Sequence, residues 1–249
     1  MTEYQGGQNV ETVSNQEMKS TRVMTGKPKI IAIDGPAGSG KSTISSKIAK
    51  QMGWSYINTG AIYRAVGLIA VEADIDIENE SQVVELVSTV ANDLVWDGDS
   101  SEIFYKGRNL TGELRSEKAG YAASVIAKQE KLRESLLPVQ RKLAMEARSG
   151  AILDGRDIGT VVFPNADVKI FLTASLEERA KRRLRQLGES CQDDLASIQS
   201  EMATRDERDA SRDAAPLKKA DDAIEFDSSS YALDEVVDNL LNLIRSKIN

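Results

Sequence analysis

The sequence of 249 residues contains no histidine and a single cysteine, Cys191. Without histidine there is no Ser-His-Asp triad, no imidazole general base and no histidine ligand for a metal ion. One cysteine excludes an intrachain disulfide framework and a cysteine-rich zinc site. These two absences remove many hydrolytic and zinc-dependent reactions from consideration.

Long apolar runs and an excess of positive charge are also missing. No apolar run approaches the length needed to cross a bilayer, and the first residues are polar without the apolar segment of a secretory signal. The formal net charge of −7 argues against a general nucleic-acid binder, which would normally be basic. With 41% hydrophobic and 29% charged residues, the composition is that of a globular protein with a sizeable core. We therefore expect a cytoplasmic protein with no membrane or nucleic-acid partner.

The most informative pattern is Gly-Pro-Ala-Gly-Ser-Gly-Lys-Ser at residues 35–42, which matches the phosphate-binding loop G-x-x-x-x-G-K-[ST]. An apolar run at 29–34 predicts a buried strand before it, and residues 43–52 have helical periodicity. Glycines let the backbone wrap a polyphosphate, and the helix N-terminus adds partial positive charge. Lys41 is predicted to reach the β- and γ-phosphates, and the Ser42 hydroxyl to ligate Mg²⁺. The predicted nucleotide-binding residues are Gly35, Pro36, Ala37, Gly38, Ser39, Gly40, Lys41, Ser42 and Thr43.

Five short apolar runs are predicted to be parallel strands, because helical stretches separate several of them. They are Ile30–Asp34, Trp54–Ile57, Ala151–Asp154, Val168–Leu172 and Ala223–Phe226. Residues 233–247 predict a final amphipathic helix. Its apolar face consists of Val236, Val237, Leu240, Leu241 and Ile244. The predicted fold is an α/β core with a five-stranded parallel sheet flanked by helices.

About ninety residues separate the second and third predicted strands, which is too many for a simple crossover. Within this stretch, residues 94–99 and 102–107 predict a β-hairpin, flanked by helices at 82–91 and 119–147. We therefore expect a small lobe at about 60–148, inserted into a domain that spans 28–249. Residues 1–27 are polar and almost unpatterned, so we expect them to form a flexible extension.

Polar segments follow two of the predicted strands. Asn-Thr-Gly-Ala-Ile-Tyr-Arg at 58–64 follows the second strand, and Asp-Gly-Arg-Asp-Ile-Gly-Thr at 154–160 follows the third. In open α/β sheets, ligands collect at the carboxyl ends of the strands. Arg156 is suited to bidentate binding of a phosphate. The alternatives are that Thr59 only caps a helix and that the charges of the second segment form a solvated ion pair, but a cap leaves Arg64 unexplained.

Basic residues gather on two further predicted helical segments. The first contains Arg179, Lys181, Arg182, Arg183 and Arg185. In the second, Arg205, Arg208, Asp209 and Arg212 recur at helical spacing and so share one face. Each segment alone is also compatible with a solvated helix face. Close to a phosphate loop, several arginines indicate phosphoryl transfer with a second, anionic substrate, a chemistry that needs no histidine.

Together, the segments at 35–43, 58–64, 154–164 and 205–217 resemble, in order and spacing, those of bacterial cytidylate (CMP/dCMP) kinases. The resemblance covers about residues 29–247. It implies a P-loop nucleoside monophosphate kinase with ATP as donor, CMP and dCMP as acceptors, and Mg²⁺. It also implies that the inserted lobe binds the nucleoside monophosphate and that a short lid spans about 177–209. We expect a monomer.

The resemblance also assigns roles to individual residues. It places the acceptor phosphate at Arg64, Arg156 and Arg212. It places the pentose at Thr59, Arg205 and Asp209, and the cytosine at Arg115 and Asp157. The predicted catalytic residues are Lys41, Arg156, Arg205 and Arg212. One departure is Asn58, where the family often has aspartate, so a carboxylate is missing beside the pentose site.

Two alternatives remain open from the sequence. The first is another small P-loop kinase whose acceptor is UMP, dTMP or shikimate. The second is a nucleotide-dependent regulatory module that binds nucleotide without transferring phosphate. A GTPase-type switch would carry an N-K-x-D motif, and this sequence contains none.

Overall fold

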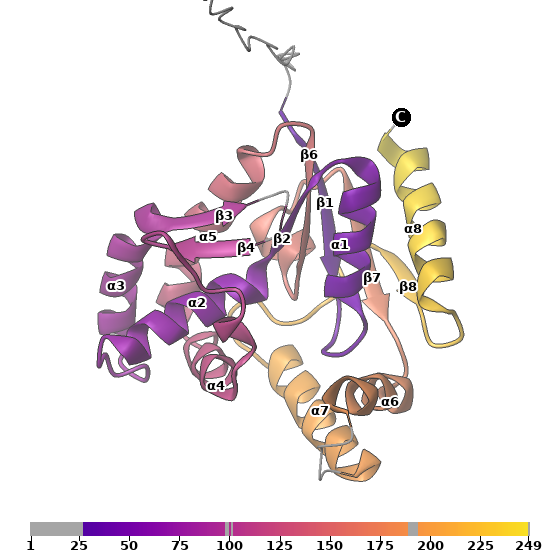
Figure 1. Ribbon diagram of the computed structural model, residues 1–249. Coiled ribbons are helices and arrows are strands. Elements are labelled where there is room, and N and C mark those ends of the chain that lie inside the picture. The colour runs from indigo at the N-terminus through magenta and orange to yellow at the C-terminus, as the bar shows by residue number, and fades with distance from the viewer. Residues whose placement is uncertain (1–26, 98–99, 101, 189–193, 249) are drawn as a thin grey trace, which may run out of the picture.

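The computed structural model describes residues 27–97, 100, 102–188 and 194–248. Within them, a parallel sheet with the strand order β2-β6-β1-β7-β8 forms the centre of the molecule (Figure 1). Its strands are β1 (Lys29–Asp34), β2 (Ser55–Asn58), β6 (Gly150–Gly155), β7 (Val168–Thr173) and β8 (Ile224–Asp227). The predicted five-stranded parallel sheet is confirmed, with every strand boundary within one residue of its predicted position.

Strand β1 lies between β6 and β7 and is buried on both faces, which explains its nearly continuous apolar sequence. Because side chains alternate along a strand, Ile31 and Ile33 pack on one face against α1 (Lys41–Met52) and α8 (Leu233–Ile248). Ile30 and Ala32 face the opposite side, where they join the core of the inserted elements. The predicted apolar face of the last helix is confirmed, since all five of its residues are buried.

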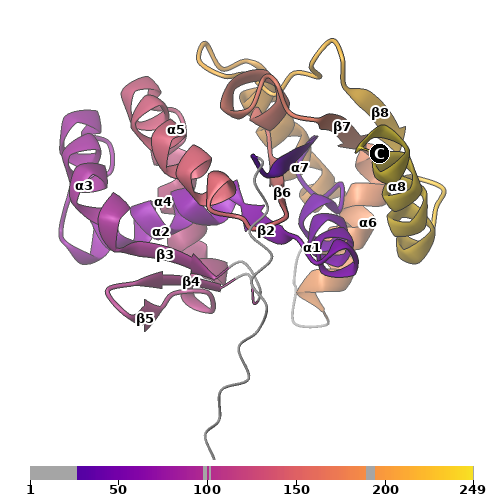
Figure 2. The same cartoon turned by 90° about the horizontal axis from the view of Figure 1, so that it is seen from above.

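The inserted elements follow β2 and end before β6, and Figure 2 shows them grouped on the side of β2, away from α8. They comprise α2 (Thr59–Glu72), α3 (Glu80–Asp93), the 3₁₀ turn η1 (Glu113–Arg115), α4 (Glu117–Ile126) and α5 (Glu130–Met145). Between α3 and η1, the antiparallel strands β3 (Leu94–Asp97), β4 (Glu102–Tyr105) and β5 (Arg108–Asn109) form a small sheet. The predicted hairpin is therefore confirmed, with a short third strand added.

The single helix predicted at 119–147 is wrong, because the chain breaks into α4 and α5 at residues 127–129. In a continuous helix, the Ala127 carbonyl would accept from the backbone amide of Lys131. That amide instead donates to Glu80 Oε1 at 2.8 Å, and the Ala127 carbonyl accepts from Arg133 Nη1 at 3.2 Å. A side chain of α3 and a side chain of α5 itself therefore replace the local hydrogen bond at the break.

Helices α6 (Leu176–Leu187) and α7 (Leu195–Ala210) lie side by side beyond the carboxyl ends of the strands (Figure 1). They share a small apolar cluster of Ala180, Ile198 and Met202. The segment predicted to be the lid spans these two helices. Cys191 and all of the predicted N-terminal extension except Lys27 lie outside the described residues. In the part of the chain that is described, no helix is long and apolar enough to cross a membrane.

Candidate active site

The phosphate-binding loop connects β1 to α1 and depends on glycine at several positions. Gly35, Gly38 and Gly40 have positive φ angles of 150°, 73° and 90°, and residues other than glycine rarely adopt such angles. A Cβ atom on Gly35 would lie 2.0 Å from the carbonyl oxygen of Leu172 in β7. The close approach of loop and sheet therefore excludes any larger residue at this position.

Lys41 is the first residue of α1, and only 5% of it is exposed. Its Nζ atom donates to the Pro36 carbonyl at 2.6 Å and to Ser39 Oγ at 3.3 Å, so the ammonium group lies within the curve of the loop. Burial lowers the pKa of Lys41 well below its ordinary value, and the positive charge of Arg156 lowers it further. An anion bound in the loop would offset both effects.

Beside the loop, Asp154 at the end of β6 forms one hydrogen-bonded network with three other side chains. Ser42 Oγ donates to Asp154 Oδ2 at 2.7 Å, and the Tyr56 hydroxyl donates to Oδ1 at 2.9 Å. The Asn58 amide donates to both of these hydroxyl groups, at 3.2 and 3.1 Å. Burial raises the pKa of Asp154 despite the hydrogen bond from Ser42. Asp154 was not among the predicted site residues, although its position directly before Gly155-Arg156 was a usable signal.

Arg156 leaves the end of β6 and meets α7. Its Nε atom donates to Asp209 Oδ2 at 2.9 Å, and its Nη1 atom donates to the Gly155 carbonyl at 3.2 Å. Asp209 is 3% exposed and also accepts from Arg212. One buried carboxylate therefore holds two of the predicted arginines and joins the β6 loop to α7.

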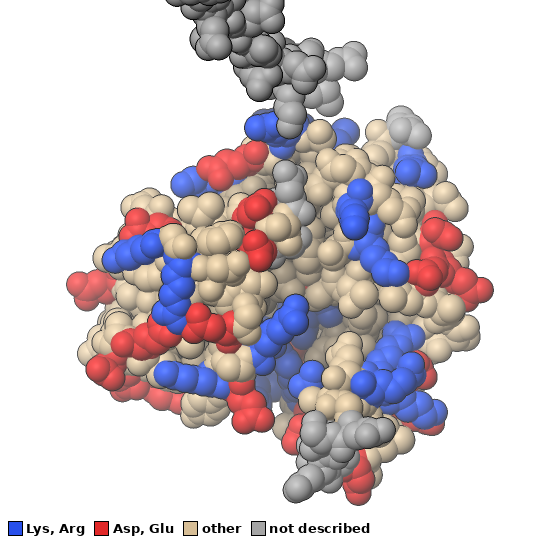
Figure 3. Space-filling view, viewed as in Figure 1, with Lys and Arg blue, Asp and Glu red and all other residues tan. Residues whose placement is uncertain are grey.

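The other predicted cations lie in the same region. Arg64 on α2 donates to the Leu114 carbonyl at 3.0 Å, and Arg205 lies exposed on α7. Burial lowers the pKa of Arg64, and the charges of Arg183 and Arg156 add to this effect. Arg156 also lies within Coulombic range of Lys41, Arg205 and Arg212. Figure 3 shows Lys and Arg side chains gathered in a hollow below the centre of the face in view.

Thr59 is buried, and its hydroxyl donates to the Asp154 carbonyl at 2.9 Å. The alternative that Thr59 caps the helix is wrong, because Asn58 is the N-cap of α2 and its Oδ1 accepts from the Ala61 amide at 3.0 Å. Asn58 therefore has two roles, since its carbonyl oxygen caps the helix and its amino group joins the Asp154 network.

Asp157 is buried and pairs with Arg133 on α5, with 2.5 Å between Oδ2 and Nη2. The Arg133 guanidinium also lies over the ring of Tyr63, 5.4 Å from its centroid. Sequence reasoning missed Arg133, because an arginine within an amphipathic helix carries no local signal. Arg115 is exposed at the end of η1, and its role at the cytosine stays a prediction.

A phosphate loop at the end of β1, facing a group of arginines from separate elements, defines the class of P-loop phosphotransferases. The model of the family described as cytidylate kinase matches residues 31–246, so the chain belongs to the cytidylate kinase family. The chain is 43% identical over 226 residues to the cytidylate kinase of Vibrio parahaemolyticus, covering 90% of this chain and 99% of that protein. It is 42% identical over 219 residues to the cytidylate kinase of Geobacillus sp., covering 88% and 97%.

Solved structures give more distant matches. A shikimate kinase from Acinetobacter baumannii in complex with shikimate covers 89% of this chain and 96% of its own, with 14% identity and a TM-score of 0.46. The structure called TT1252 from Thermus thermophilus covers 90% and 100%, with 18% identity and a TM-score of 0.45. Similarity at this level carries no information about the acceptor.

Proposed function

We propose that this protein transfers the γ-phosphoryl group of ATP to CMP and dCMP. The observation that carries the proposal is the pair of facing anion sites. One is the phosphate loop with Lys41, and the other is the arginine group of Arg64, Arg156 and Arg212. Arg156 lies within Coulombic range of Lys41, which suits a donor phosphate and an acceptor phosphate held next to each other. Membership of the cytidylate kinase family supports CMP as the acceptor.

The geometry supports catalysis by positioning and charge stabilisation. The loop amides and Lys41 bind the donor phosphates, and Lys41 stabilises the charge on the transferred group. Arg64, Arg156 and Arg212 neutralise the acceptor phosphate and align its attacking oxygen. Arg205, exposed on α7 and within Coulombic range of Arg156, adds a further positive charge from the lid side. Because the attacking oxygen is already anionic, no strong general base is needed, in agreement with the absence of histidine.

Ser42 and Asp154 suit a magnesium ion. Mg²⁺ prefers oxygen ligands and usually keeps several waters, binding through one or two protein groups and the substrate phosphates. The Ser42 hydroxyl and the Asp154 carboxylate supply two such oxygens, 2.7 Å apart, beside the loop. Among the described residues, no group of three or more His, Cys, Asp or Glu side chains could hold a metal ion. The bound ion would neutralise part of the phosphate charge.

The remaining assignments concern the nucleoside. Thr59, Arg205 and Asp209 are proposed to contact the pentose, and Arg115 and Asp157 the cytosine. Support for the base site comes from Asp157, whose carboxylate is held in place by the buried pair with Arg133. The protein is proposed to be a monomer and to act in the cytoplasm.

The decisive experiment measures ADP release from ATP with CMP, dCMP, UMP, dTMP and shikimate as separate acceptors. We expect kcat/KM to be greatest for CMP and dCMP. A greater kcat/KM for UMP, dTMP or shikimate would assign the protein to another acceptor. ATP binding without ADP formation for any acceptor would favour the regulatory module.

A further inference from the structure

An ion pair between α6 and α7 lies directly against the phosphate loop. Arg179 on α6 and Asp206 on α7 are 2.5 Å apart, measured from Nη1 to Oδ2, with side-chain exposures of 8% and 20%. Arg179 Nε also donates to the Ala174 carbonyl at 3.0 Å, which anchors the guanidinium at the junction of β7 and α6. Neither residue has a role in the proposed transfer.

The ion pair holds both backbone polar groups of one loop residue, Ala37. The Ala37 amide donates to Asp206 Oδ1 at 3.2 Å, and the Ala37 carbonyl accepts from Arg179 Nη1 at 3.0 Å. The two side chains and the backbone of Ala37 therefore close a ring of three hydrogen bonds. Bonds to charged groups are stronger than neutral ones, so this ring fixes the orientation of the peptide groups on both sides of residue 37.

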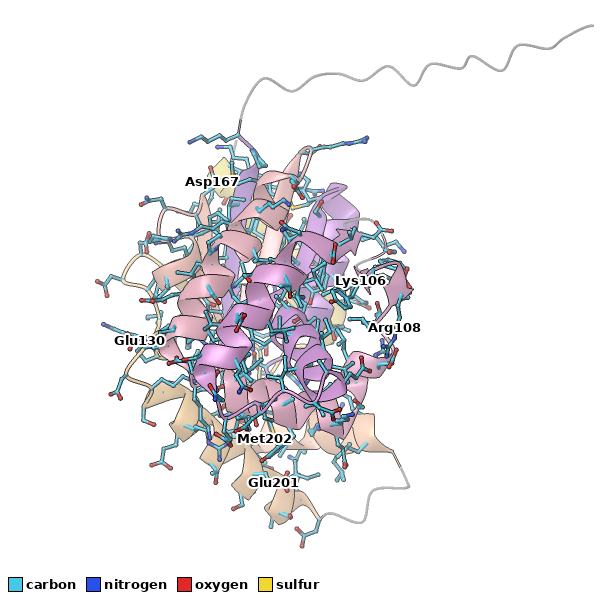
Figure 4. The ribbon with its side chains drawn as sticks, turned by 90° about the vertical axis from the view of Figure 1, so that its left-hand side faces the viewer. Lys106, Arg108, Glu130, Asp167, Glu201 and Met202 are labelled. Carbon is cyan, nitrogen blue, oxygen red and sulfur yellow. The ribbon has the colours of Figure 1, made fainter. Side chains whose placement is uncertain are left out.

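Packing at the next residue of the loop supports the same connection. Met202 lies one helical turn before Asp206 and is 8% exposed. In Figure 4, Met202 lies on the side of α7 that faces the body of the molecule, whereas Glu201 points away from it. A Cβ atom on Gly38 would lie 2.4 Å from Met202 Cε and 3.4 Å from Arg179 Cβ. Helix α7 therefore touches the loop through an apolar contact and through the ion pair.

We propose that the Arg179–Asp206 ion pair is a positioning device that holds the phosphate loop in its binding conformation and makes ATP binding depend on α6 and α7. The loop amides must converge on one anion, yet glycines at 35, 38 and 40 give this backbone more freedom than other residues would. The ring at Ala37 restricts that freedom before ATP arrives, so less conformational entropy is lost on binding. The inference rests on the proposed function only for the identity of ATP.

The test is Asp206→Asn in the full chain, which keeps the side-chain size and removes the charge. The asparagine oxygen still accepts from Ala37, but its amino group cannot pair with Arg179. We expect Kd for ATP, measured by calorimetry, to rise about tenfold, because a charged hydrogen bond is lost. Kd for CMP should stay within about twofold. Without nucleotide, hydrogen exchange of the Ala37 amide should accelerate about tenfold.

Glu207→Gln is the matched control, since it removes the same charge from the next, exposed position of α7. This control should keep wild-type values of Kd for ATP and of hydrogen exchange. The double variant Arg179→Met, Asp206→Leu leaves no unpaired buried charge, so its melting temperature should be close to that of the wild type. It should still bind ATP weakly. Recovery of ATP affinity in this double variant would mean that the ion pair contributes to stability alone.

An unchanged Kd for ATP in Asp206→Asn, or equal losses for ATP and CMP, would overturn the inference. A wild-type protein that binds no ATP, combined with faster exchange at Ala37 in Asp206→Asn, would contradict the proposed function and leave standing only the part of the inference that concerns the loop conformation.

Discussion

At the scale of single residues, burial shifts the pKa of two charged groups beside the phosphate loop. Burial lowers the pKa of Lys41 and raises that of Asp34 to about 6, in each case against the charged form. Asp34 ends β1 and accepts hydrogen bonds from the amides of Ile158, at 2.8 Å, and Gly159, at 2.7 Å. These bonds oppose the shift of Asp34 without cancelling it. The residue directly before the phosphate loop, Asp34, therefore has a carboxyl group with a pKa of about 6.

We expect Asp34→Asn to remove part of the pH dependence of stability. Because the pKa of Asp34 is raised from 3.8 to about 6, the folded protein binds this proton more tightly than the unfolded chain does. The contribution of Asp34 to the free energy of unfolding is greatest at low pH, where the carboxyl group is protonated. It falls as pH rises from about 4 to about 6 and is constant at higher pH. From about pH 4 to about pH 7, the free energy of unfolding of the wild type should fall relative to that of the variant by on the order of 2 kcal/mol.

Denaturant unfolding at the two pH values measures this difference. Groups that titrate in both proteins cancel, so the comparison isolates Asp34. A difference between wild type and variant that stays constant with pH would show that Asp34 has an ordinary pKa in the folded protein.

Lys41→Met should lower kcat by on the order of 100-fold to 1000-fold, because it removes a charge that acts chiefly on the transition state. The fold should persist, since methionine has a similar length and relieves the burial of an ammonium group. Steady-state kinetics at saturating ATP and CMP measures kcat, and circular dichroism checks the fold. Near-wild-type kcat would exclude the loop as the catalytic phosphate site.

At the scale of elements, α7 connects two parts of the site. Met202 and Asp206 face the phosphate loop, and Asp209 reaches the arginines. Their spacings of four and three residues place them along one side of the helix. A small movement of α7 therefore affects the loop and the arginine group together.

Asp209→Ala is expected to raise KM for CMP and dCMP on the order of tenfold, with a much smaller effect on KM for ATP. A simple helix ion pair of Asp209 with Arg212 would contribute only a few tenths of a kcal/mol. The carboxylate is instead 3% exposed and also holds Arg156, so its removal leaves two cations without their partner. The melting temperature should therefore fall as well. Initial rates with each acceptor measure the KM values, and thermal melts measure the stability. Wild-type KM values in Asp209→Ala would weaken the assignment of this segment to the acceptor.

The elements were predictable from sequence wherever local patterns determined them. The strands follow apolar runs, and the glycine pattern of residues 35–42 predicts a loop whose backbone can wrap a phosphate. The break at 127–129 was not predictable, because it contains neither glycine nor proline and depends on Glu80 from another helix. The pairs Asp157–Arg133 and Arg179–Asp206 were missed for the same reason. Each joins residues that only the tertiary fold brings together.

At the scale of the whole molecule, a group of cations has gathered in a chain whose net charge is −7. Lys41, Arg64, Arg205 and Arg212 each lie within Coulombic range of Arg156. Like charges at close range destabilise the folded protein until anions bind among them. Substrate binding should therefore stabilise the fold by more than the contacts to the base and the sugar alone would provide.

We expect a non-hydrolysable ATP analogue and CMP to raise the melting temperature less when added together than the sum of their separate effects. Each ligand at a hundredfold excess over its Kd adds about 2.7 kcal/mol of stability by mass action. The first ligand also lowers the positive potential that attracts the second anion, which gives an unfavourable coupling free energy. Differential scanning fluorimetry with chloride held constant measures the shifts. Strictly additive shifts would argue against electrostatic coupling between the two sites.

The position of β6 in the sheet has a consequence for synthesis on the ribosome. Strand β6 lies between β1 and β2, so these two strands have no hydrogen-bonded contact of their own. A nascent chain that ends before residue 150 therefore contains both strands but cannot join them, and the edges that pair with β6 stay unpaired until β6 has emerged. The insert makes this interval longer, because all of its helices are translated first. During that time the elongating polypeptide exposes strand edges that can pair with other chains.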